Sequence, residues 1–153
     1  MTIVRSREEL EPVIVTADEG KAIDATPTGA LVTIKFGSDA TNGSFCVFES
    51  RRSQGDTRGP GIHAHPGFDE VFYVLEGEYE ITIDGDQVLA IPGTAVFVPR
   101  SHFHTFAATG RAESKMLHFV TPGGFEHYFE DSMASSQPGA AASKYGIVFK
   151  DEA

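Results

Sequence analysis

Short apolar runs at near-regular spacing fill the chain from Ala30 to Pro122, and they constrain its fold more than any other feature. Glycine, proline and aspartate separate the runs, and helical periodicity is absent from this part of the sequence. Such a pattern predicts a β-sandwich or a β-barrel. The expected strands are residues 30–36, 44–50, 70–75, 78–83, 87–91, 95–98, 104–107 and 114–121.

Two of these strands show how the barrel should be built. Asp84-Gly85 follows the strand at residues 78–83, and both residues tolerate the positive φ of a type I′ turn, so we expect a hairpin there. Apolar and polar residues alternate along 78–83, which predicts one buried face and one wet face. Residues 70–75 are apolar on both faces. That strand should therefore be covered on both sides, by the N-terminal segment, a C-terminal helix or a second subunit.

The chain is long enough for one domain, and we divide its 153 residues into three parts. The parts are an N-terminal segment packing on the barrel (1–29), the barrel core (30–122) and a C-terminal region (123–153). In the last part, residues 125–133 have the pattern of a short amphipathic helix. Residues 134–143 are almost wholly Ala, Ser, Gly, Gln and Pro, which predicts a flexible linker. Residues 145–149 are expected to return as an edge strand.

Charge and cysteine content exclude several classes of protein. The formal net charge is −10, so nucleic acid and anionic lipid surfaces would be repelled, and neither is an expected partner. Cys46, the single cysteine, cannot form an internal disulfide, and the first residues are not a basic segment followed by an apolar one. We therefore expect a cytoplasmic protein. Its longest apolar runs fall far short of the ~20 residues that span a bilayer.

Histidines and a glutamate cluster in the segment from residue 61 to residue 70. His63 and His65 are two positions apart, so on a strand both imidazoles project to the same face. Glu70 lies an odd number of positions from both, which on one straight strand would place it on the opposite face. Pro66-Gly67 supplies a turn that restarts the register, and the carboxylate can then join from the neighbouring strand.

A third imidazole can come from His102 or from His104. Three imidazoles and one carboxylate suit a first-row divalent ion, with room for a water or a substrate oxygen. Fe, Mn, Ni, Co, Cu and Zn all accept these donors, so the residues predict one divalent transition metal without fixing its identity.

These residues resemble the two sequence motifs of the cupin superfamily. The first motif is matched by His63, His65, Glu70 and Gly77, and the second by Gly93, Pro99, Ser101 in place of the usual glycine, and His104. The sequence departs from the family pattern at Thr57, where a glycine usually opens the first motif, and at Ala108, where an asparagine often closes the second.

The resemblance implies an all-β cupin (RmlC-like) fold, a double-stranded β-helix or jelly-roll barrel with a short C-terminal helix. It also implies that His104, and not His102, is the third histidine ligand. The implied metal ligands are His63, His65, Glu70 and His104. Homodimers are common among cupins, and a homodimer would also explain a strand that is apolar on both faces.

A narrower similarity lies in residues 119–126, Phe-Val-Thr-Pro-Gly-Gly-Phe-Glu, followed by Lys-Tyr-Gly-Ile at 144–147. This order resembles single-domain bacterial cupins described as quercetin 2,3-dioxygenase-like. It implies a metal-dependent dioxygenase whose small-molecule substrate is an enolisable compound, either flavonol-like or another aromatic or polyketide-type molecule. Dioxygen would be the second substrate, and Glu70 would act as the catalytic base as well as a ligand.

Two other functions stay open. The same ion could polarise a carbonyl without redox chemistry, as in an isomerase, lyase or decarboxylase. The barrel could also be a non-catalytic module that binds or senses a small molecule, because one fold hosts many functions. Oxygen dependence separates the first from the oxygenase, and ligand retention without turnover identifies the second.

The remaining candidates have ordinary structural interpretations that we prefer. His102 is expected at the surface or beside a ligand, His118 either in a buried hydrogen bond or against substrate, and His127 in solvent. We expect four aromatic rings in the core before any role in a substrate cage: Phe72, Phe97, Phe106 and Phe125. Solvated positions are expected for Arg51, Arg52, Arg58 and Arg100, with an anionic substrate at the barrel mouth as the alternative.

Overall fold

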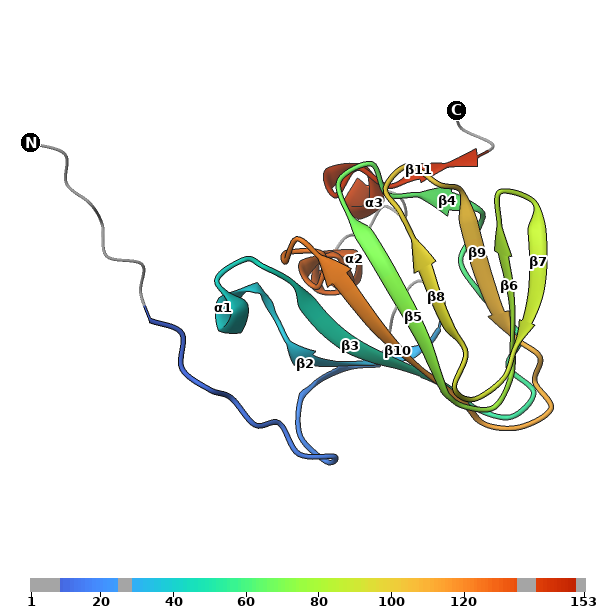
Figure 1. Cartoon of the computed structure of the whole chain (residues 1–153), viewed down its shortest axis with the longest axis horizontal. Helices are drawn as coiled ribbons and strands as arrows, with labels where there is room; N and C mark the ends of the chain where they lie inside the picture. The colour runs from blue at the N-terminus through green and yellow to red at the C-terminus, as the bar shows by residue number, and fades with distance from the viewer. Residues whose placement is uncertain (1–8, 25–28, 135–139, 151–153) are drawn as a thin grey trace, which may run out of the picture.

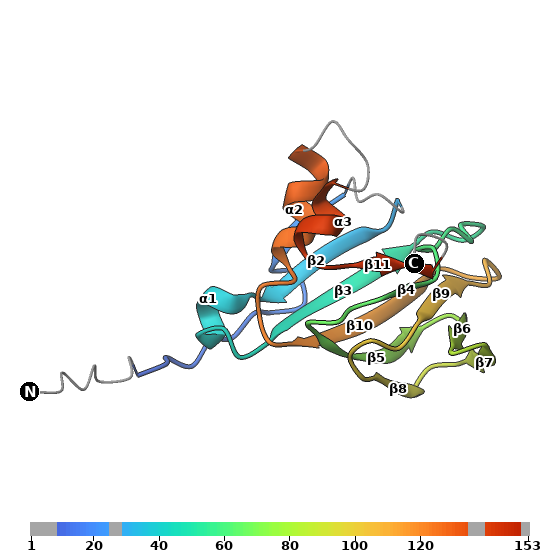
Figure 2. The ribbon, with the colours of Figure 1, turned by 90° about the horizontal axis from the view of Figure 1, so that it is seen from above.

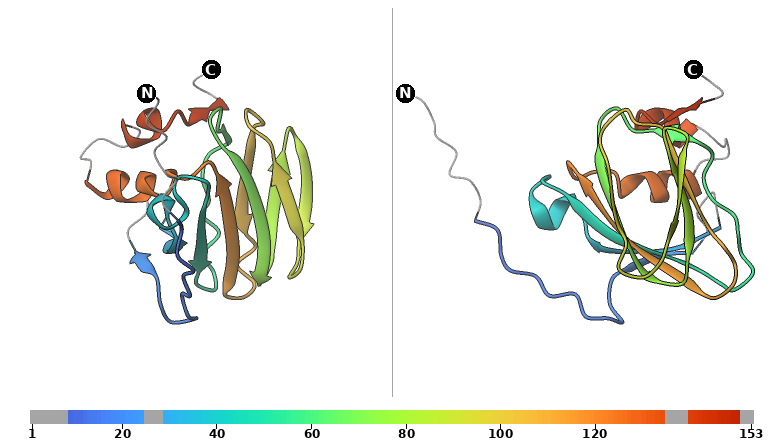
Figure 3. Two further views of the ribbon diagram at one scale, coloured as in Figure 1. Left: turned by 60° about the vertical axis from the view of Figure 1, so that its left-hand side comes forward. Right: turned by 45° about the vertical axis from the view of Figure 1, so that its right-hand side comes forward.

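The structure is a computed structural model of the chain, and it describes residues 9–24, 29–134 and 140–150. Its strands form two antiparallel sheets that together enclose a barrel (Figure 1). The larger sheet has the order β1 (Lys21–Ile23), β2 (Leu31–Phe36), β3 (Cys46–Arg52), β10 (Ser114–Thr121), β5 (Asp69–Glu76), β8 (Ala95–Val98). The smaller has the order β11 (Val148–Phe149), β4 (His63–Ala64), β9 (His104–Ala108), β6 (Tyr79–Ile83), β7 (Asp86–Ala90). The right-hand view of Figure 3 shows the outline of the barrel.

The strand order follows the jelly-roll pattern, because neighbours in each sheet are distant in sequence. β10 lies between β3 and β5, and β9 lies between β4 and β6. The predicted all-β jelly-roll fold is confirmed. The predicted hairpin is also present: Asp84 and Gly85 both have positive φ, at 49° and 89°, and join β6 to β7.

Alternate residues of the larger sheet point into the barrel, as the two-residue period of a strand requires. Along β10 the buried residues are Ser114, Met116, His118 and Val120. Along β3 they are Cys46, Phe48, Ser50 and Arg52. These inward side chains build the floor on which the candidate site lies.

Two hydrophobic clusters fill the interior. The dry cluster occupies the β6–β7 end and consists of Phe72, Val74, Tyr79, Ile81, Ala90, Val98, Ala108 and Met116. The roof cluster lies at the opposite end and consists of Ile23, Val32, Ile34, Cys46, Phe48, Val120, Phe125, Ala142 and Ile147. Three short helices complete the fold: α1 (Ser38–Thr41), α2 (His127–Ala134) and α3 (Ala140–Lys144). α2 and α3 lie side by side beyond β2 and close the roof end (Figure 2).

The C-terminal region differs from its prediction in one element. The linker expected at 134–143 was wrong for its last residues, because Ala140–Lys144 forms α3, while residues 135–139 lie outside the described part. Alanine has the highest helix propensity, and Ala141 and Ala142 are buried, so this stretch gains packing as a helix. β11 pairs with β4. Within the described residues, none of the helices has the length and apolar character that crossing a membrane requires.

The N-terminal segment divides at residue 20. β1 joins the edge of the larger sheet and places Ile23 in the roof cluster. Residues 9–15 instead run away from the barrel (Figure 1), and Ile14 is almost fully exposed. Lys35 explains the bend between the two parts, because its ammonium donates to the backbone oxygens of residues 16, 17 and 19.

The outer face of β5 is open to solvent. Tyr73 is 41% exposed and Leu75 is 36% exposed, and Phe97 on the neighbouring β8 is 60% exposed. Phe97 was expected in the core, and that prediction was wrong. Val96 and Val98 take the inward positions of β8 and pack against the dry cluster, so the residue between them must point outward.

Candidate metal centre

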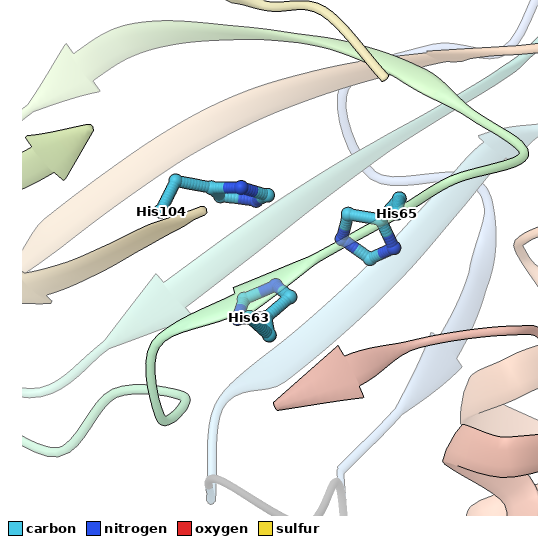
Figure 4. Close-up of side chains that lie close together, drawn as sticks. All are labelled: His63, His65 and His104. Carbon is cyan, nitrogen blue, oxygen red and sulfur yellow. The ribbon is translucent and has the colours of Figure 1, made fainter. Parts of the chain in front are cut away.

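Three imidazoles converge inside the barrel (Figure 4). His63 lies in β4 directly opposite His104 in β9, and His65 follows two positions later with the same facing. One ring nitrogen of each lies within 4.8 Å of one from each of the other two, and all three side chains are buried. The rings are also in contact, with centroids 4.4 Å apart for His63 and His104.

Glu70 joins this cluster from the larger sheet. Its Oε2 atom lies 3.5 Å from Nε2 of His65 and 3.5 Å from Nε2 of His104. The turn after His65 brings it there, since Phe68 N–H and Ser101 N–H both donate to the His65 carbonyl. The buried carboxylate therefore sits on the sheet opposite β4 and β9 and faces the imidazoles across the barrel.

Backbone carbonyls fix two of the rings in the form that a metal ligand needs. His63 Nδ1 lies 2.6 Å from the Gly61 oxygen, and His104 Nδ1 lies 2.9 Å from the His102 oxygen. A carbonyl only accepts, so each Nδ1 carries the proton and each Nε2 keeps a lone pair. Nε2 of His104 and Nδ1 of His65 are both buried, and neither has a hydrogen-bond partner among the described residues. A cation among the rings would satisfy the lone pair of His104, so this donor set fits a metal ion.

Electrostatics favours neutral rings for His63 and His65 beside an ionised carboxylate. Burial, helped by the neighbouring imidazoles, lowers the pKa of His63 to about 4, and burial also lowers the pKa of His65. Burial alone would raise the pKa of Glu70, but the nearby imidazoles of His104 and His118 hold it well below its usual range. Burial acts to lower the pKa of His104, and the Glu70 carboxylate outweighs this and raises it. At neutral pH the cluster offers a negative oxygen from Glu70 and lone pairs from His63 and His65, which are donors that first-row divalent ions prefer.

A cavity of about 90 Å³ opens beside the cluster, and His63, His65 and Glu70 form part of its wall. This is several times the ~10–15 Å³ that one buried water needs. The rest of the wall is mainly apolar, and its aromatic rings come from Phe48, Phe106, Phe125, Tyr128, Phe129 and Phe149. Phe106 and Phe125 thus line the cavity, while Phe72 lies in the dry cluster.

The other predicted polar residues lie away from the cluster. His102 is 47% exposed in its side chain and bonds Asp84 at 2.6 Å. His127 is exposed at the start of α2. Three of the arginines named in the sequence analysis are exposed and make surface ion pairs: Arg51 with Glu113, Arg58 with Asp56, and Arg100 with Asp69.

Arg52 was expected in solvent, and that prediction was wrong. Its side chain is 2% exposed and pairs with Asp56 at 3.2 Å. The residue is the last inward position of β3, in step with Phe48 and Ser50, so strand parity carries the guanidinium into the barrel.

Sequence reasoning missed Ser50 and left His118 with two interpretations. Nε2 of His118 lies 2.8 Å from Ser50 Oγ, and its Nδ1 lies 3.2 Å from Glu70 Oε1. His118 is therefore a buried, hydrogen-bonded histidine. The sequence alone did not show which face of this strand points inward, and only the pairing of β10 with β3 and β5 identifies the partners of His118.

Comparison with known proteins supports a family assignment. The model of the cupin domain matches residues 52–129, about half of the chain. Quercetin 2,3-dioxygenase of Bacillus subtilis (strain 168) is 31% identical over 119 residues, which make up 77% of this chain. The chain spans about a third (34%) of the length of that curated relative.

Solved structures share the fold at lower identity. KdgF from Halomonas sp. superposes with a TM-score of 0.65 at 17% identity, covering 76% of this chain and 98% of that one. The polyketide cyclase RemF from Streptomyces resistomycificus has a TM-score of 0.62 at 22% identity, covering 72% and 80%. At such identities the likeness concerns the fold. The family model covers residues 52–129, which include the motifs around His63 and His104. The chain therefore belongs to the cupin family.

Proposed function

We propose that this cupin is a metal-dependent dioxygenase acting on an enolisable small molecule, either flavonol-like or another aromatic or polyketide-type compound. One divalent ion, of Fe, Mn, Ni, Co, Cu or Zn, would be held in the barrel. Its ligands would be His63, His65, Glu70 and His104. The observation that carries the proposal is the buried cluster of three imidazoles and a carboxylate beside an aromatic cavity.

The bound ion would supply Lewis acidity that stabilises negative charge on a substrate oxygen, and redox chemistry if it is a redox metal. We assign the role of base to Glu70, because its carboxylate lines the cavity in which the substrate would bind. Phe106 and Phe125 present ring surfaces on which a planar aromatic substrate can pack. The apolar walls exclude bulk water, which strengthens each electrostatic interaction at the reacting centre.

The choice of a dioxygenase among metal-dependent reactions is supported by the Bacillus subtilis relative, a quercetin 2,3-dioxygenase that is 31% identical over 119 residues. The test is oxygen uptake. Protein whose metal has been identified by elemental analysis is mixed with flavonols and other enolisable aromatic compounds in an oxygen electrode. We expect uptake with at least one compound and none with His104→Ala.

Two results would redirect the proposal. Turnover that continues without oxygen would replace the dioxygenase with an isomerase, lyase or decarboxylase built on the same centre. A metal-loaded protein that retains an aromatic ligand unchanged would be a binding module. Failure of the wild-type protein to retain any divalent ion would overturn the metal centre itself.

We also propose that the protein forms a homodimer through the outer face of β5 and β8. From the sequence we expected the N-terminal segment, a C-terminal helix or a second subunit to cover this face. Residues 9–15 run away from the barrel, residues 16–19 are held by Lys35 of β2, and α2 and α3 lie at the roof end (Figures 1 and 2). A second copy is the remaining cover for Tyr73, Leu75 and Phe97, and such a face is self-complementary across a two-fold axis.

A further inference from the structure

A chain of three buried side chains runs from the cavity wall to the proposed metal centre. Ser50 Oγ lies 2.8 Å from His118 Nε2, and His118 Nδ1 lies 3.2 Å from Glu70 Oε1. All three residues line the same cavity, and His118 is only 2% exposed. Neither the cupin motifs nor the family resemblance assigns a role to Ser50 or His118.

Strand register explains why these three side chains meet. β10 lies between β3 and β5, and His118 is paired with Phe48 on one side and Phe72 on the other. Ser50 is two positions from Phe48 along β3, and Glu70 is two positions from Phe72 along β5. The imidazole therefore reaches diagonally to both partners across three neighbouring strands.

Aromatic packing holds the ring in this orientation. Phe48 stacks on the imidazole with centroids 4.5 Å apart and planes 11° from parallel. Phe72 meets it edge-on at 5.2 Å, and Phe106 lies at 5.5 Å. Because rings on three sides confine it, the line from Nε2 to Nδ1 stays directed from Ser50 to Glu70.

The Glu70 carboxylate fixes the direction of both hydrogen bonds. A carboxylate only accepts, so His118 Nδ1–H donates to Oε1 of Glu70. Nε2 is then the acceptor, and the Ser50 hydroxyl donates to it. With Oε1 held in this way, Oε2 is the oxygen that lies 3.5 Å from Nε2 of both His65 and His104.

We propose that His118, with its tautomer set by Ser50, is a positioning residue that fixes Glu70 with one oxygen bonded and the other turned toward the three imidazoles. This inference rests on the proposed metal centre. Partners of this kind, which hydrogen-bond a ligating side chain, typically change metal affinity ~10–100-fold when removed. The preorganised carboxylate would bind the ion without first having to be ordered.

The order serine, histidine, carboxylate also occurs in acyl-transfer enzymes, but the backbone around Ser50 does not suit that chemistry. Ser50 lies within β3 and is paired with Val32 on one side and Met116 on the other. A nucleophilic serine needs nearby free N–H groups to form an oxyanion hole, whereas these strands use theirs in the sheet. Positioning of Glu70 is therefore the role that the geometry supports.

The test measures binding of Co²⁺ to metal-free protein by competition with a chelator, together with the visible absorption of the bound ion. His118→Phe keeps a ring between Phe48 and Phe72 but removes both hydrogen bonds, and should weaken Co²⁺ binding ~10–100-fold with an altered spectrum. His118→Asn retains a donor near Nδ1 and should restore most of the affinity. Ser50→Ala should show a smaller loss in the same direction.

Met116→Leu is the matched control. Met116 is the preceding inward residue of β10 and equally buried, but belongs to the dry cluster, so its substitution should leave Co²⁺ binding unchanged. Melting curves of every variant establish that it is folded. If His118→Phe does not fold, His118→Asn and Ser50→Ala decide: loss with Ser50→Ala and near-normal binding with His118→Asn supports the inference.

The possible failures can be told apart. Wild-type affinity and spectrum in both His118→Phe and Ser50→Ala would overturn the positioning role while leaving the metal centre intact. A similar loss in His118→Phe and His118→Asn would also overturn it, because the donor to Glu70 would then have no special effect. If wild-type protein binds Co²⁺ no better than His104→Ala, the proposed function fails at its centre and the inference falls with it.

Discussion

The two ends of the barrel interior are built by the same strands but differ in chemistry. At the dry end, Phe72 of β5 and Met116 of β10 belong to one hydrophobic cluster with Ile81. At the site end, Glu70 of β5 and His118 of β10 form a buried hydrogen bond instead. The two pairs are two residues apart on each strand, or ~7 Å along it. A single repeat of strand alternation therefore separates a packed core from a polar centre.

This contrast shows how the fold supports a buried carboxylate. The dry cluster contributes apolar burial on folding, whereas the site end must match each buried polar group with a partner. His118 matches Glu70, and backbone carbonyls match His63 and His104. Substitutions at the dry end should thus reduce stability and spare metal binding, and substitutions at the site end should do the reverse.

Removal of a histidine ligand should have the largest effect. His104→Ala takes away a nitrogen that is buried without a hydrogen-bond partner among the described residues, and we expect it to abolish metal retention in a folded barrel. Elemental analysis after dialysis measures the retained ion, and circular dichroism checks the fold. His102→Ala is the matched control, since His102 is exposed and only its backbone oxygen contacts His104. Equal metal content in both variants would contradict the assignment of His104.

At the dry end, Ile81→Ala should cost ~2–5 kcal/mol of unfolding free energy, because a fully buried isoleucine leaves a cavity. Urea unfolding measures the loss. Ile81 belongs to the dry cluster and is paired with Phe106, not with a proposed ligand, so metal affinity under native conditions should stay at the wild-type value. A metal affinity that falls in proportion to stability would mean that the two ends are not independent.

The roof over the cavity should respond to acid. Glu126 is buried and accepts N–H bonds from Ser38 and Gly124, which ties the start of α1 to the turn before α2. Burial alone would raise its pKa, but these donors outweigh burial and lower it. A depressed folded pKa contributes stability above the unfolded value, and that stability is lost as the pH falls through the folded pKa.

Glu126→Gln should therefore cost ~1–3 kcal/mol at neutral pH, the typical penalty for disturbing a buried hydrogen-bonded group. Urea unfolding at a series of pH values measures the difference between variant and wild type. It should shrink below the ordinary pKa of a glutamate. Glu80→Gln, at an exposed position of β6, is the control. A difference that is independent of pH would show that the charge of Glu126 does not matter.

The sequence was sufficient for features that depend on local pattern. Strand alternation predicted the inward face of β6, and the pair at 84–85 predicted the hairpin. The two-residue spacing of His63 and His65 predicted their common facing, which the structure has. The bond between Ser50 and His118 could not be predicted, because it depends on which distant strands become neighbours.

Two other misses have the same origin in the register of single strands. Arg52 looked like a surface residue by type, but parity along β3 carries it inward, where it meets Asp56. Phe97 looked like a core residue by type, but parity along β8 carries it outward. In both cases the position within the strand outweighs the ordinary preference of the residue for water or core.

Substitution of Phe97 should have the smallest effect on the stability of the monomer. The same substitution tests the proposed dimer. Phe97→Lys replaces a 60% exposed ring, so unfolding free energy per chain should change by no more than ~0.5 kcal/mol apart from any lost association. Across a two-fold axis the substitution enters the interface twice, and burying two unpaired ammonium groups is unfavourable. Analytical ultracentrifugation should therefore show a dimeric wild type and a monomeric variant.

Val88→Lys is the control, because Val88 is 48% exposed on β7 of the other sheet and its substitution should leave the dimer intact. A monomeric wild type, or a variant that remains dimeric, would mean that the outer face of β5 and β8 is not the interface.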